Sequence, residues 1–536
     1  MAAEGKQMVF GEDGSIDTHG NPLPVLSKSA SKMKIDRLMN TPLPTFHGST
    51  PGSRFWTWIA TNMLRSTLFF QFRSYQISGR ENIPQEGGTL CCGWHTNGLI
   101  DPAAIMTSHP KNFVIGGRHD LVTRPIIGFW ARKMAVQPVV RQAELIRGGC
   151  SEEMAATLNG RSLLNLSTGI SHGFGCFLFP EGTSHDESHI LRFKTGPMRT
   201  ALSAAALAKG NGKPAPTIIP IGLHWRVRHH WRTDAWIEYG EPIKIEAESL
   251  GPEVAEKLAR GEWNEPPADI VNSLREELRQ RLQPMTPDAP DWPTHRAWHL
   301  LGHLEGAAMG RRPKTWRGEV LAARQVRDGM ATTPDEERLA KARDVAETLE
   351  EKRLDARALT NTGEVRKASI LATPKNALKL LIGLLMLPFF IPSSGIIAIS
   401  GKYLGDKNIE NEGLDARTSY QLLISMFGSF FLWPPIALII ALVSVFIVGD
   451  STWMGIAVGA VGNEWMTVLI MTPTLVILFL LSAITTVNAW DSVEDIRRAM
   501  RRSSLRRSPD GAKVQKLCQE LLSSPPKAMK PTNPTD

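Results

Sequence analysis

The sequence has few cysteines, and their placement excludes two kinds of site. The 536 residues include five cysteines, which form no C-x-x-C pair and show no ligand spacing with histidine. A structural zinc site or a disulfide framework is therefore not expected. A reducing compartment is the simpler interpretation.

Motifs of several enzyme classes are also missing. The chain has no G-x-S-x-G elbow of a serine hydrolase, and neither G-x-G-x-x-G nor G-x-x-x-x-G-K-[ST] of nucleotide-binding folds. The histidine-rich "RVRHHWR" has no chelating spacing, so we expect no metal. We interpret the histidines outside the first motif as surface or rim residues, namely His172, His185, His189, His224, His229 and His230. The net charge of +8 is too diffuse for a nucleic-acid partner, but it suits an anionic surface or a phosphorylated substrate.

The amino-terminal part lacks an apolar core of its own. Residues 1–50 are rich in Gly, Ser, Pro and Lys and resemble neither a signal peptide nor a packed domain, so we expect a disordered arm. Apolar residues then follow helical spacing from Phe55 to Phe72. Because Arg65 lies in its middle, this segment is predicted to lie in the membrane interface and not to cross the bilayer.

Short apolar runs alternate with helix-like segments from Tyr75 to about Ile245, which is typical of an α/β domain. With the preceding helix at 55–72 and the amphipathic helix that ends near residue 284, we assign residues 51–330 to this domain. Residues 331–375 are predicted to be a charged, solvated helical connector. Thr333 would cap its helix, with Pro334 at the first helical position.

The chain changes character after residue 375. Apolar stretches at Leu380–Ile399, Tyr420–Val448 and Met466–Val487 are each about long enough to cross a hydrocarbon core. Residues 376–490 are therefore predicted to be an α-helical, multi-pass membrane region, and residues 491–536 a basic, Pro-rich tail. Lys and Arg flank both ends of the region, whereas the loop Gly449–Trp465 has none. This pattern favours two spans and one re-entrant hairpin, with both ends cytosolic.

A histidine and an aspartate stand close together in "WHTNGLIDPAAI". Asp101 precedes Pro102, so it has the form of a helix N-cap, and this interpretation needs no partner. The same carboxylate could also accept a hydrogen bond from His95, which would fix the ring tautomer and leave the other nitrogen as a base. Both roles stay open at this point.

A second cluster follows in "GCFLFPEGTSHDES". A strand-like run ends there in a turn that offers the Glu181 carboxylate, main-chain N–H groups, and the hydroxyls of Thr183 and Ser184. The alternative is an ordinary turn in which Gly182 supplies a positive φ and Glu181 is solvated.

In order and spacing, these two motifs, together with "MAVQPVVRQ", "LRFKTG" and "IIPIGL", resemble the glycerolipid acyltransferase superfamily over roughly residues 75–245. The usual first motif of that family is H-x4-D. Here five residues, Thr96 to Ile100, separate the pair, as in the fungal-type glycerol-3-phosphate and dihydroxyacetone-phosphate acyltransferases. The resemblance implies a mixed sheet flanked by helices, which the α-helical membrane domain follows.

The resemblance also implies roles for single residues. His95 would be the general base and Asp101 its orienting partner. Arg141 would bind the acceptor's phosphate, although a surface arginine is the alternative. Glu181 would recognise a glycerol hydroxyl or support Arg141. The implied substrate-binding set is Arg141, Glu181, Gly182, Thr183, Ser184 and Lys194.

The implied activity is O-acylation of glycerol 3-phosphate or dihydroxyacetone phosphate in phospholipid biosynthesis. The expected partners are a lipid membrane, the phosphorylated glycerol acceptor, and an acyl thioester of CoA or of an acyl carrier protein. That thioester is a co-substrate, and no cofactor is expected. Two alternatives stay open: a 1-acylglycerol-3-phosphate acyltransferase, and a non-catalytic lipid-binding scaffold. The active site is expected at the cytosolic face.

Overall fold

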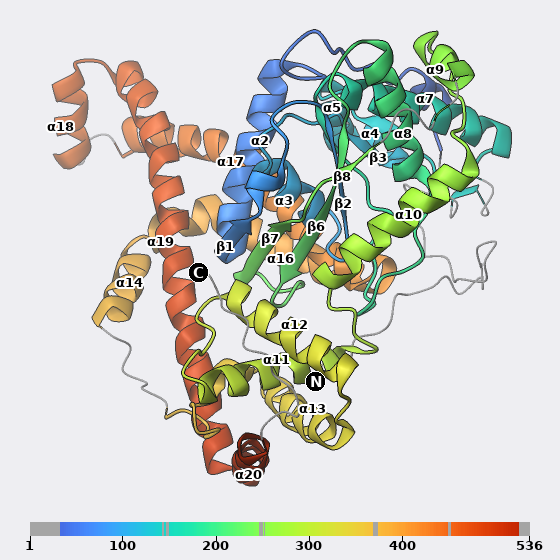
Figure 1. Ribbon diagram of the computed structural model, residues 1–536. Coiled ribbons are helices and arrows are strands. Elements are labelled where there is room, and N and C mark those ends of the chain that lie inside the picture. Colours follow the sequence, from blue (N-terminus) through green and yellow to red (C-terminus); the bar gives the residue numbers. More distant parts are fainter. Residues whose placement is uncertain are drawn as a thin grey trace. The chain divides into compact units, whose positions relative to one another are not determined.

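The computed structural model of the protein describes residues 33–141, 144–145, 149–245, 250, 252–367, 374–448 and 452–524. The chain divides into two compact units (Figure 1). Unit 1 holds the chain up to Trp292 together with Lys407–Ser419, and unit 2 holds Pro293–Asp406 and the chain from Tyr420 onward. Each unit is described by itself.

Unit 1 is built on a six-stranded mixed sheet. Its strands are, in spatial order, β1 (Phe72–Ser78), β7 (Thr233–Tyr239), β6 (Thr217–Trp225), β2 (Thr89–Gly93) and β5 (Gly175–Phe177), with β8 (Ile243–Lys244) also paired to β6. The pairs β1–β7, β6–β2 and β2–β5 are parallel, whereas β6–β7 and β6–β8 are antiparallel. A small parallel sheet of β3 (Gly116–Arg118) and β4 (Gln137–Val139) accompanies it. The predicted α/β fold with a mixed sheet is confirmed.

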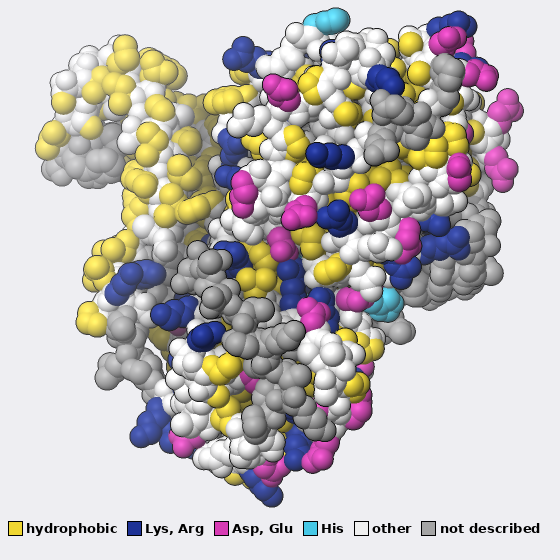
Figure 2. Space-filling model, in the orientation of Figure 1, with side chains coloured by type: hydrophobic (Ala, Val, Ile, Leu, Met, Phe, Trp, Pro, Cys, Tyr) yellow, Lys and Arg dark blue, Asp and Glu magenta, His cyan; other side chains and the backbone are white. Residues whose placement is uncertain are grey.

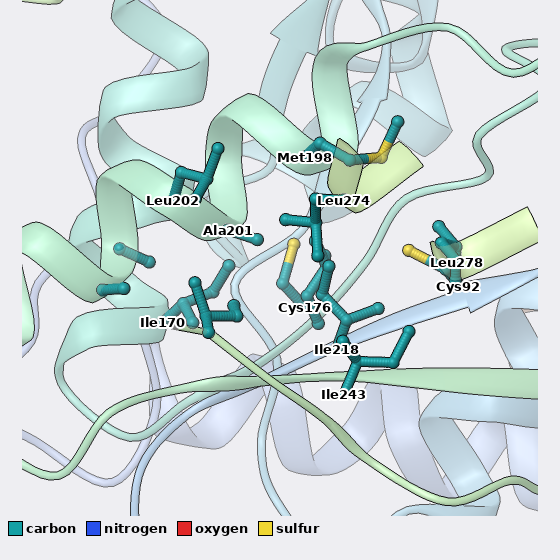
Figure 3. Packing of buried hydrophobic residues seen from close by; sticks show 14 of the residues in the cluster. Cys92, Ile170, Cys176, Met198, Ala201, Leu202, Ile218, Ile243, Leu274 and Leu278 are labelled. Atoms are coloured by element: carbon teal, nitrogen blue, oxygen red, sulfur yellow. The ribbon is translucent and has the colours of Figure 1, made fainter. Parts of the chain in front are cut away.

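Two buried cores cover the two faces of the sheet, because successive side chains of a strand point to opposite sides. Leu90 and Cys92 of β2 lie in one core (Figure 3), and Cys91 between them lies in the other. The helices of unit 1 are α1 (Ile35–Met39), α2 (Arg54–Gln71), α3 (Ile100–Ser108), α4 (His119–Thr123), α5 (Pro125–Lys133), α7 (Glu152–Ser171), α8 (Gly196–Gly210), α9 (Pro252–Ala259) and α10 (Ala268–Leu282). Helices α8 and α10 supply the first core, and α3 and α4 the second.

Helix α2 confirms the amphipathic helix expected at 55–72. The Ser53 side chain caps its start, and Trp56 packs edge-on against Phe129 and Trp130 near α5. Trp58, on another side of the helix, is 65% exposed. An exposed aromatic face on an otherwise packed helix is typical of an element that meets a membrane interface.

Residues 33–50 differ from the expected disordered arm. They include α1, whose Leu38 is fully buried in the second core. Phe46 stacks on His172 with ring centroids 5.2 Å apart, and the Ser49 carbonyl accepts a hydrogen bond from Asn112. Composition alone did not predict that this segment is ordered, because its few apolar side chains pack into the core of unit 1 and form no separate core. Residues 1–32 of the predicted arm lie outside the described residues.

Unit 2 begins earlier than the predicted domain boundary at residue 330. Its first helices are α11 (Trp292–Ala308), α12 (Trp316–Thr332) and α13 (Glu336–Glu351). The last of these was predicted to be a solvated connector, but Val345 and Leu349 are buried. Its N-cap is Asp335 and not Thr333, and the Asp335 side chain accepts the Arg338 N–H at 3.1 Å.

The predicted tail also folds. Helix α19 (Glu464–Arg507) continues well past residue 490, and α20 (Pro509–Ser523) follows it. The buried Arg338 of α13 donates to the Leu521 carbonyl at 2.8 Å and to Glu305 at 2.7 Å. A buried charge needs such partners. Only the last part of the expected tail, residues 525–536, lies outside the described residues.

Among the described residues, two helices are long and apolar enough to cross a membrane. They are α17 (Arg417–Phe446), whose first three residues belong to unit 1, and α19. They confirm the stretches expected at Tyr420–Val448 and Met466–Val487. Hydrophobic side chains gather over α18 (Thr452–Val461) and the neighbouring part of α19 (Figure 2). Thus α18 occupies much of the predicted loop Gly449–Trp465, of which residues 449–451 lie outside the described residues.

The third apolar stretch, expected at Leu380–Ile399, is broken. It spans α14 (Pro374–Leu385), α15 (Leu387–Phe390), a π-helical turn (Ile391–Gly395) and α16 (Ile396–Glu412). The chain bends by 51° between α14 and the following helical segment. Pro388 and Pro392 lie at this break, where each removes a main-chain donor. By length and composition the pair is either one broken span or a re-entrant element.

Acid is expected to destabilise the fold, in part through His109. Burial lowers the pKa of His109 to about 4, so the folded state keeps the ring neutral while the unfolded chain protonates it below pH 6.5. This stabilisation is complete above pH 6.5 and is lost as the pH falls toward 4, with a loss of about 2 kcal/mol at pH 5. Thermal unfolding in detergent at pH 7.5 and at pH 5 measures this loss of stability. His109→Gln should show a smaller shift between the two pH values, and an unchanged shift would contradict the assignment.

Candidate active site

The two motifs that contain His95 and Glu181 lie at the carboxyl ends of two neighbouring parallel strands. β2 pairs with β5, with Cys91 opposite Phe177, and His95 and Glu181 follow these strands. In α/β folds the carboxyl ends of parallel strands form the edge where ligands bind. The fold therefore joins two motifs that are 86 positions apart in the sequence.

His95 and Asp101 form a hydrogen-bonded pair. His95 Nδ1 lies 2.8 Å from Asp101 Oδ2, and the Asp101 side chain is fully buried whereas that of His95 is 15% exposed. Because a carboxylate accepts the proton on Nδ1, the ring carries its lone pair on Nε2. This is the tautomer that a general base requires.

Asp101 is not the N-cap of the helix that follows it. Helix α3 begins at Ile100, one residue earlier, and no side-chain bond caps it from the preceding residue. Asp101 Oδ2 instead accepts the upstream N–H groups of Thr96, at 2.9 Å, and Asn97, at 2.8 Å. The cap interpretation is therefore wrong. The carboxylate holds the five-residue spacer folded back, and Gly98 permits this turn with a φ of +36°.

Two aromatic side chains complete the surroundings of the pair. Trp225 Nε1 donates to Asp101 Oδ1 at 2.9 Å, so both oxygens of the carboxylate are engaged and its orientation is fixed. Phe179 stacks on the His95 ring, with centroids 3.9 Å apart and an interplanar angle of 10°. The imidazole is thus held by one hydrogen bond at its edge and by an aromatic ring against its face.

Glu181 is buried and braces the main chain of His95. Its Oε2 accepts the His95 N–H at 3.0 Å, and its Oε1 accepts the Leu191 N–H at 2.9 Å. The same Oε1 lies 2.9 Å from His185 Nε2, and the His185 N–H donates to the His95 carbonyl at 3.1 Å. The second motif therefore holds His95 by both its N–H and its carbonyl. The sequence did not predict this bracing role, and its interpretation of His185 as a surface or rim residue is wrong, because His185 is fully buried.

The other predicted residues of the second motif lie in the same turn. Gly182 has a φ of +75°, which favours glycine, and a Cβ there would lie 3.3 Å from Lys194 Cγ. The Lys194 N–H donates to the Pro180 carbonyl at 2.6 Å. "LRFKTG" therefore folds back onto "FPEGTS", which places Lys194 beside Gly182. Thr183 and Ser184 are half-buried next to them.

Arg141 follows β4, in the part of unit 1 that carries the small sheet. Its Nε and Nη2 donate to Glu144 Oε1 at 2.8 and 2.7 Å, and Glu144 is fully buried. Support of Arg141 was one of the two roles expected for Glu181, and the structure gives it to Glu144. Among the described residues, no hydrogen bond joins Arg141 to His95 or Glu181, so its phosphate role stays a prediction.

Arg228 belongs to "RVRHHWR", which the sequence placed at the surface or rim. Its guanidinium donates to the carbonyls of Thr96, at 3.4 Å, and His185, at 3.1 Å. It also forms an ion pair with Asp186 and lies 5.4 Å from the Trp292 ring centre. Arg228 therefore joins the two motifs. The residue spacing in the sequence did not predict this role, because Arg228 is far from both motifs in the sequence. The turn between β6 and β7 brings it to the site.

In the ranges that the structure describes, no group of three or more His, Cys, Asp or Glu side chains could hold a metal ion. Charged groups around the site are paired with one another, as Arg141 is with Glu144 and Arg228 with Asp186. The chemistry that the described geometry supports is proton transfer by a histidine whose partner carboxylate is fixed by four donors.

Part of the chain is similar in sequence to known acyltransferases. Residues 74–224 match the family model described as "Acyltransferase". The glycerol-3-phosphate O-acyltransferase 2 of Saccharomyces cerevisiae is 31% identical over 153 residues, which are 28% of this chain and 19% of that protein. Glycerol-3-phosphate O-acyltransferase 1 of the same yeast is 29% identical over 125 residues, 23% of this chain and 15% of that protein. These matches thus span less than a fifth of either relative.

A solved structure is also similar. The crystal structure of the 1-acyl-sn-glycerophosphate (LPA) acyltransferase PlsC from Thermotoga maritima aligns with 42% of this chain and 80% of that chain. The sequence identity is 16% and the TM-score 0.27. The family match covers the segments that contain His95, Asp101, Arg141 and Glu181. Residues 74–224 therefore match an acyltransferase domain, and this part of the chain is similar to the yeast glycerol-3-phosphate O-acyltransferases.

Proposed function

We propose that the protein transfers a fatty acyl group from an acyl thioester to a hydroxyl of glycerol 3-phosphate or dihydroxyacetone phosphate at a membrane. The observation that carries this proposal is the His95–Asp101 pair, in which a fully engaged carboxylate fixes the tautomer of a partly exposed imidazole. The donor is a thioester of CoA or of an acyl carrier protein, and the transfer step uses no cofactor.

In this mechanism His95 Nε2 takes the proton of the acceptor hydroxyl as that oxygen attacks the thioester carbonyl. A tetrahedral intermediate forms and then collapses, so the carbon–sulfur bond breaks and the new ester remains on the acceptor. The departing sulfur receives the proton from the imidazolium. Asp101 stabilises the imidazolium between the two proton transfers. Proton and electrons therefore balance without a further reactant.

The acceptor's phosphate is assigned to Arg141. Glu144 engages Nε and Nη2 of the guanidinium, and Nη1 takes no part in that pair. A guanidinium fixed in this way loses little conformational freedom when it binds a phosphate oxygen. Lys194 adds positive charge beside Gly182. Since both oxygens of Glu181 are engaged within the protein, we assign acceptor hydroxyl recognition to Thr183 and Ser184, and to Glu181 only its bracing role.

The membrane placement follows from charge. Lys402 and Lys407 precede α17, and Arg417 is its first residue. The second half of α19 carries a cluster of arginines, whereas the segment between the two apolar helices has no Lys or Arg. Positively charged flanks favour the cytosolic side. We therefore propose an integral membrane protein that crosses the bilayer twice. The start of the first span and the end of the second lie on the cytosolic side, and the active site lies on the same side. Exposed aromatics on α2 add an interfacial contact.

An acceptor assay tests this function. Purified protein in detergent receives a labelled acyl-CoA with glycerol 3-phosphate, dihydroxyacetone phosphate or lysophosphatidate in separate reactions. We expect the largest kcat/KM with one of the two water-soluble acceptors. Arg141→Lys should raise the KM of that acceptor about ten-fold or more and leave the KM of the thioester unchanged, because lysine keeps the charge but loses the planar fork.

Arg161→Lys is the matched control, since Arg161 donates to main-chain carbonyls away from the pair, including that of Thr41. A clear preference for lysophosphatidate would replace the proposed acceptor. Equal effects of Arg141→Lys on both substrates would contradict the phosphate role.

A further inference from the structure

The first turn of α17 belongs to unit 1 and contacts the loop that carries the catalytic pair. The Leu99 N–H donates to Ser419 Oγ at 2.8 Å. The Thr418 hydroxyl donates to the Asn97 side-chain carbonyl. These contacts join residues about 320 positions apart in the sequence. Thr418 is fully buried and Ser419 is 9% exposed.

The Ser419 hydroxyl satisfies a main-chain donor at the start of α3. Leu99 is the N-cap residue of that helix and makes no side-chain cap of its own. The N–H groups at a helix start have no partner within the helix, and leaving one buried and unpaired is costly. The partner of Leu99 therefore comes from α17 and not from the neighbouring sequence.

Asn97 is the second point of attachment, and its polar groups are engaged on three sides. Its N–H donates to Asp101 Oδ2 at 2.8 Å, and its Nδ2 donates to the Arg228 carbonyl at 3.1 Å. Its Oδ1 accepts from Thr418. A displacement of Asn97 therefore moves one of the donors that fix the carboxylate facing His95.

A third contact supports the same docking. Arg417 Nη1 donates to the His229 carbonyl at 3.3 Å, next to Arg228, which joins the two motifs. Three consecutive residues, Arg417 to Ser419, thus contact either the 95–101 loop or the main chain next to Arg228. The family match ends at residue 224, so none of these three residues lies within it.

We propose that Thr418 and Ser419 are positioning residues for acyl transfer: their hydroxyls hold the 95–101 loop in the form that aligns Asp101 with His95. The inference rests on the proposed function, and it adds that the acyltransferase domain is incomplete without a segment that follows it by almost 200 residues. The two hydroxyls touch no reacting atom and act through Asn97 and Leu99.

Variants of the full-length protein test the proposal. Thr418→Val keeps the side-chain shape and removes the hydroxyl, and Ser419→Ala removes the other one. Each should lower kcat about ten-fold, the factor expected when one buried partner loses its hydrogen bond, with little change in either KM. Thr418→Ser restores the hydroxyl and should bring kcat back to within about two-fold of the unmodified protein. Ser429→Ala is the matched control, since that hydroxyl bonds only the preceding turn of α17.

Hydrogen exchange separates this inference from the proposed function. In Ser419→Ala, amide exchange in a peptide covering residues 95–100 should become faster, and in Ser429→Ala it should not change. This readout needs no substrate. If the unmodified protein acylates none of the three acceptors, the proposed function fails and exchange alone decides the positioning role. Unchanged exchange, or a fully active Thr418→Val in an active enzyme, would overturn the inference. A loss of kcat that Thr418→Ser does not restore would show a merely structural role.

Discussion

His95→Ala is expected to lower kcat about 10²- to 10⁴-fold, because it removes the only group proposed to take the acceptor's proton. The fold should change little. The His95 side chain is partly exposed, and its main-chain bonds to Glu181 and His185 do not need the ring. Thermal unfolding and turnover with the preferred acceptor are the two measurements.

The control for this variant is His47→Ala, which removes an exposed histidine of the same unit. It should leave both turnover and unfolding unchanged. A His95→Ala protein that keeps more than about a tenth of normal turnover would contradict the general-base role. A comparable loss in the His47→Ala protein would point to general damage from handling and not to catalysis.

Asp101→Asn is expected to produce a loss of similar size, roughly 10²- to 10⁴-fold in kcat. All four partners of the carboxylate donate hydrogen bonds, three to Oδ2 and one to Oδ1. The asparagine amide has only one acceptor atom, its oxygen. Its NH₂ group must therefore face the donors that reached one of the two carboxylate oxygens, and it cannot accept their hydrogen bonds. The imidazole then loses either its correct tautomer or its fixed orientation, and the imidazolium loses its counter-charge.

Trp225→Phe is the graded companion of that change. It keeps an aromatic ring and removes only the N–H that reaches Asp101 Oδ1. A loss of about ten-fold is expected, because one neutral donor to a buried charge is removed while the charge itself stays. Activity and unfolding should be measured together. An active Asp101→Asn enzyme would leave Asp101 with a structural role only.

The contact between His95 and Asp101 could be predicted from the sequence because the two residues belong to one short motif. Their spacing allowed either a cap or a partner role for Asp101, and only the coordinates decided between them. The decisive partners are the N–H groups of Thr96 and Asn97, which no side-chain pattern reveals. Glu181 was found by its motif, but its bracing role was not, since its partner is the main chain of His95.

Trp225, Arg228, Thr418 and Ser419 could not be found in this way. Each contacts the 95–101 loop from more than 120 positions away in the sequence, and none belongs to a spaced motif with a known chemistry. Their contribution depends on the pairing of β6 with β2 and on the docking of the first turn of α17. Periodicity predicts that a helix forms, but not what its first turn touches.

Errors in the domain boundaries have a common physical cause. Leu38 in the expected arm and Val345 in the expected connector lie in segments that carry several charged residues, yet both are fully buried. A short segment can become ordered by packing its apolar side chains into a core that other segments form, and the local composition of the short segment does not reveal this. The apolar helices α17 and α19 were predicted correctly because twenty or so consecutive apolar residues need no distant partner to be recognised.

The central claim is acyl transfer to a phosphorylated glycerol by the His95–Asp101 pair. The most direct test follows thiol release from an acyl-CoA by the purified protein, with and without glycerol 3-phosphate or dihydroxyacetone phosphate, while mass spectrometry measures the acylated product. The account predicts that thiol release requires one of these acceptors, that one acylated glycerol phosphate forms for each thiol released, and that both signals fall together in His95→Ala. Thiol release that needs no acceptor, or product formation that persists in His95→Ala, would contradict it.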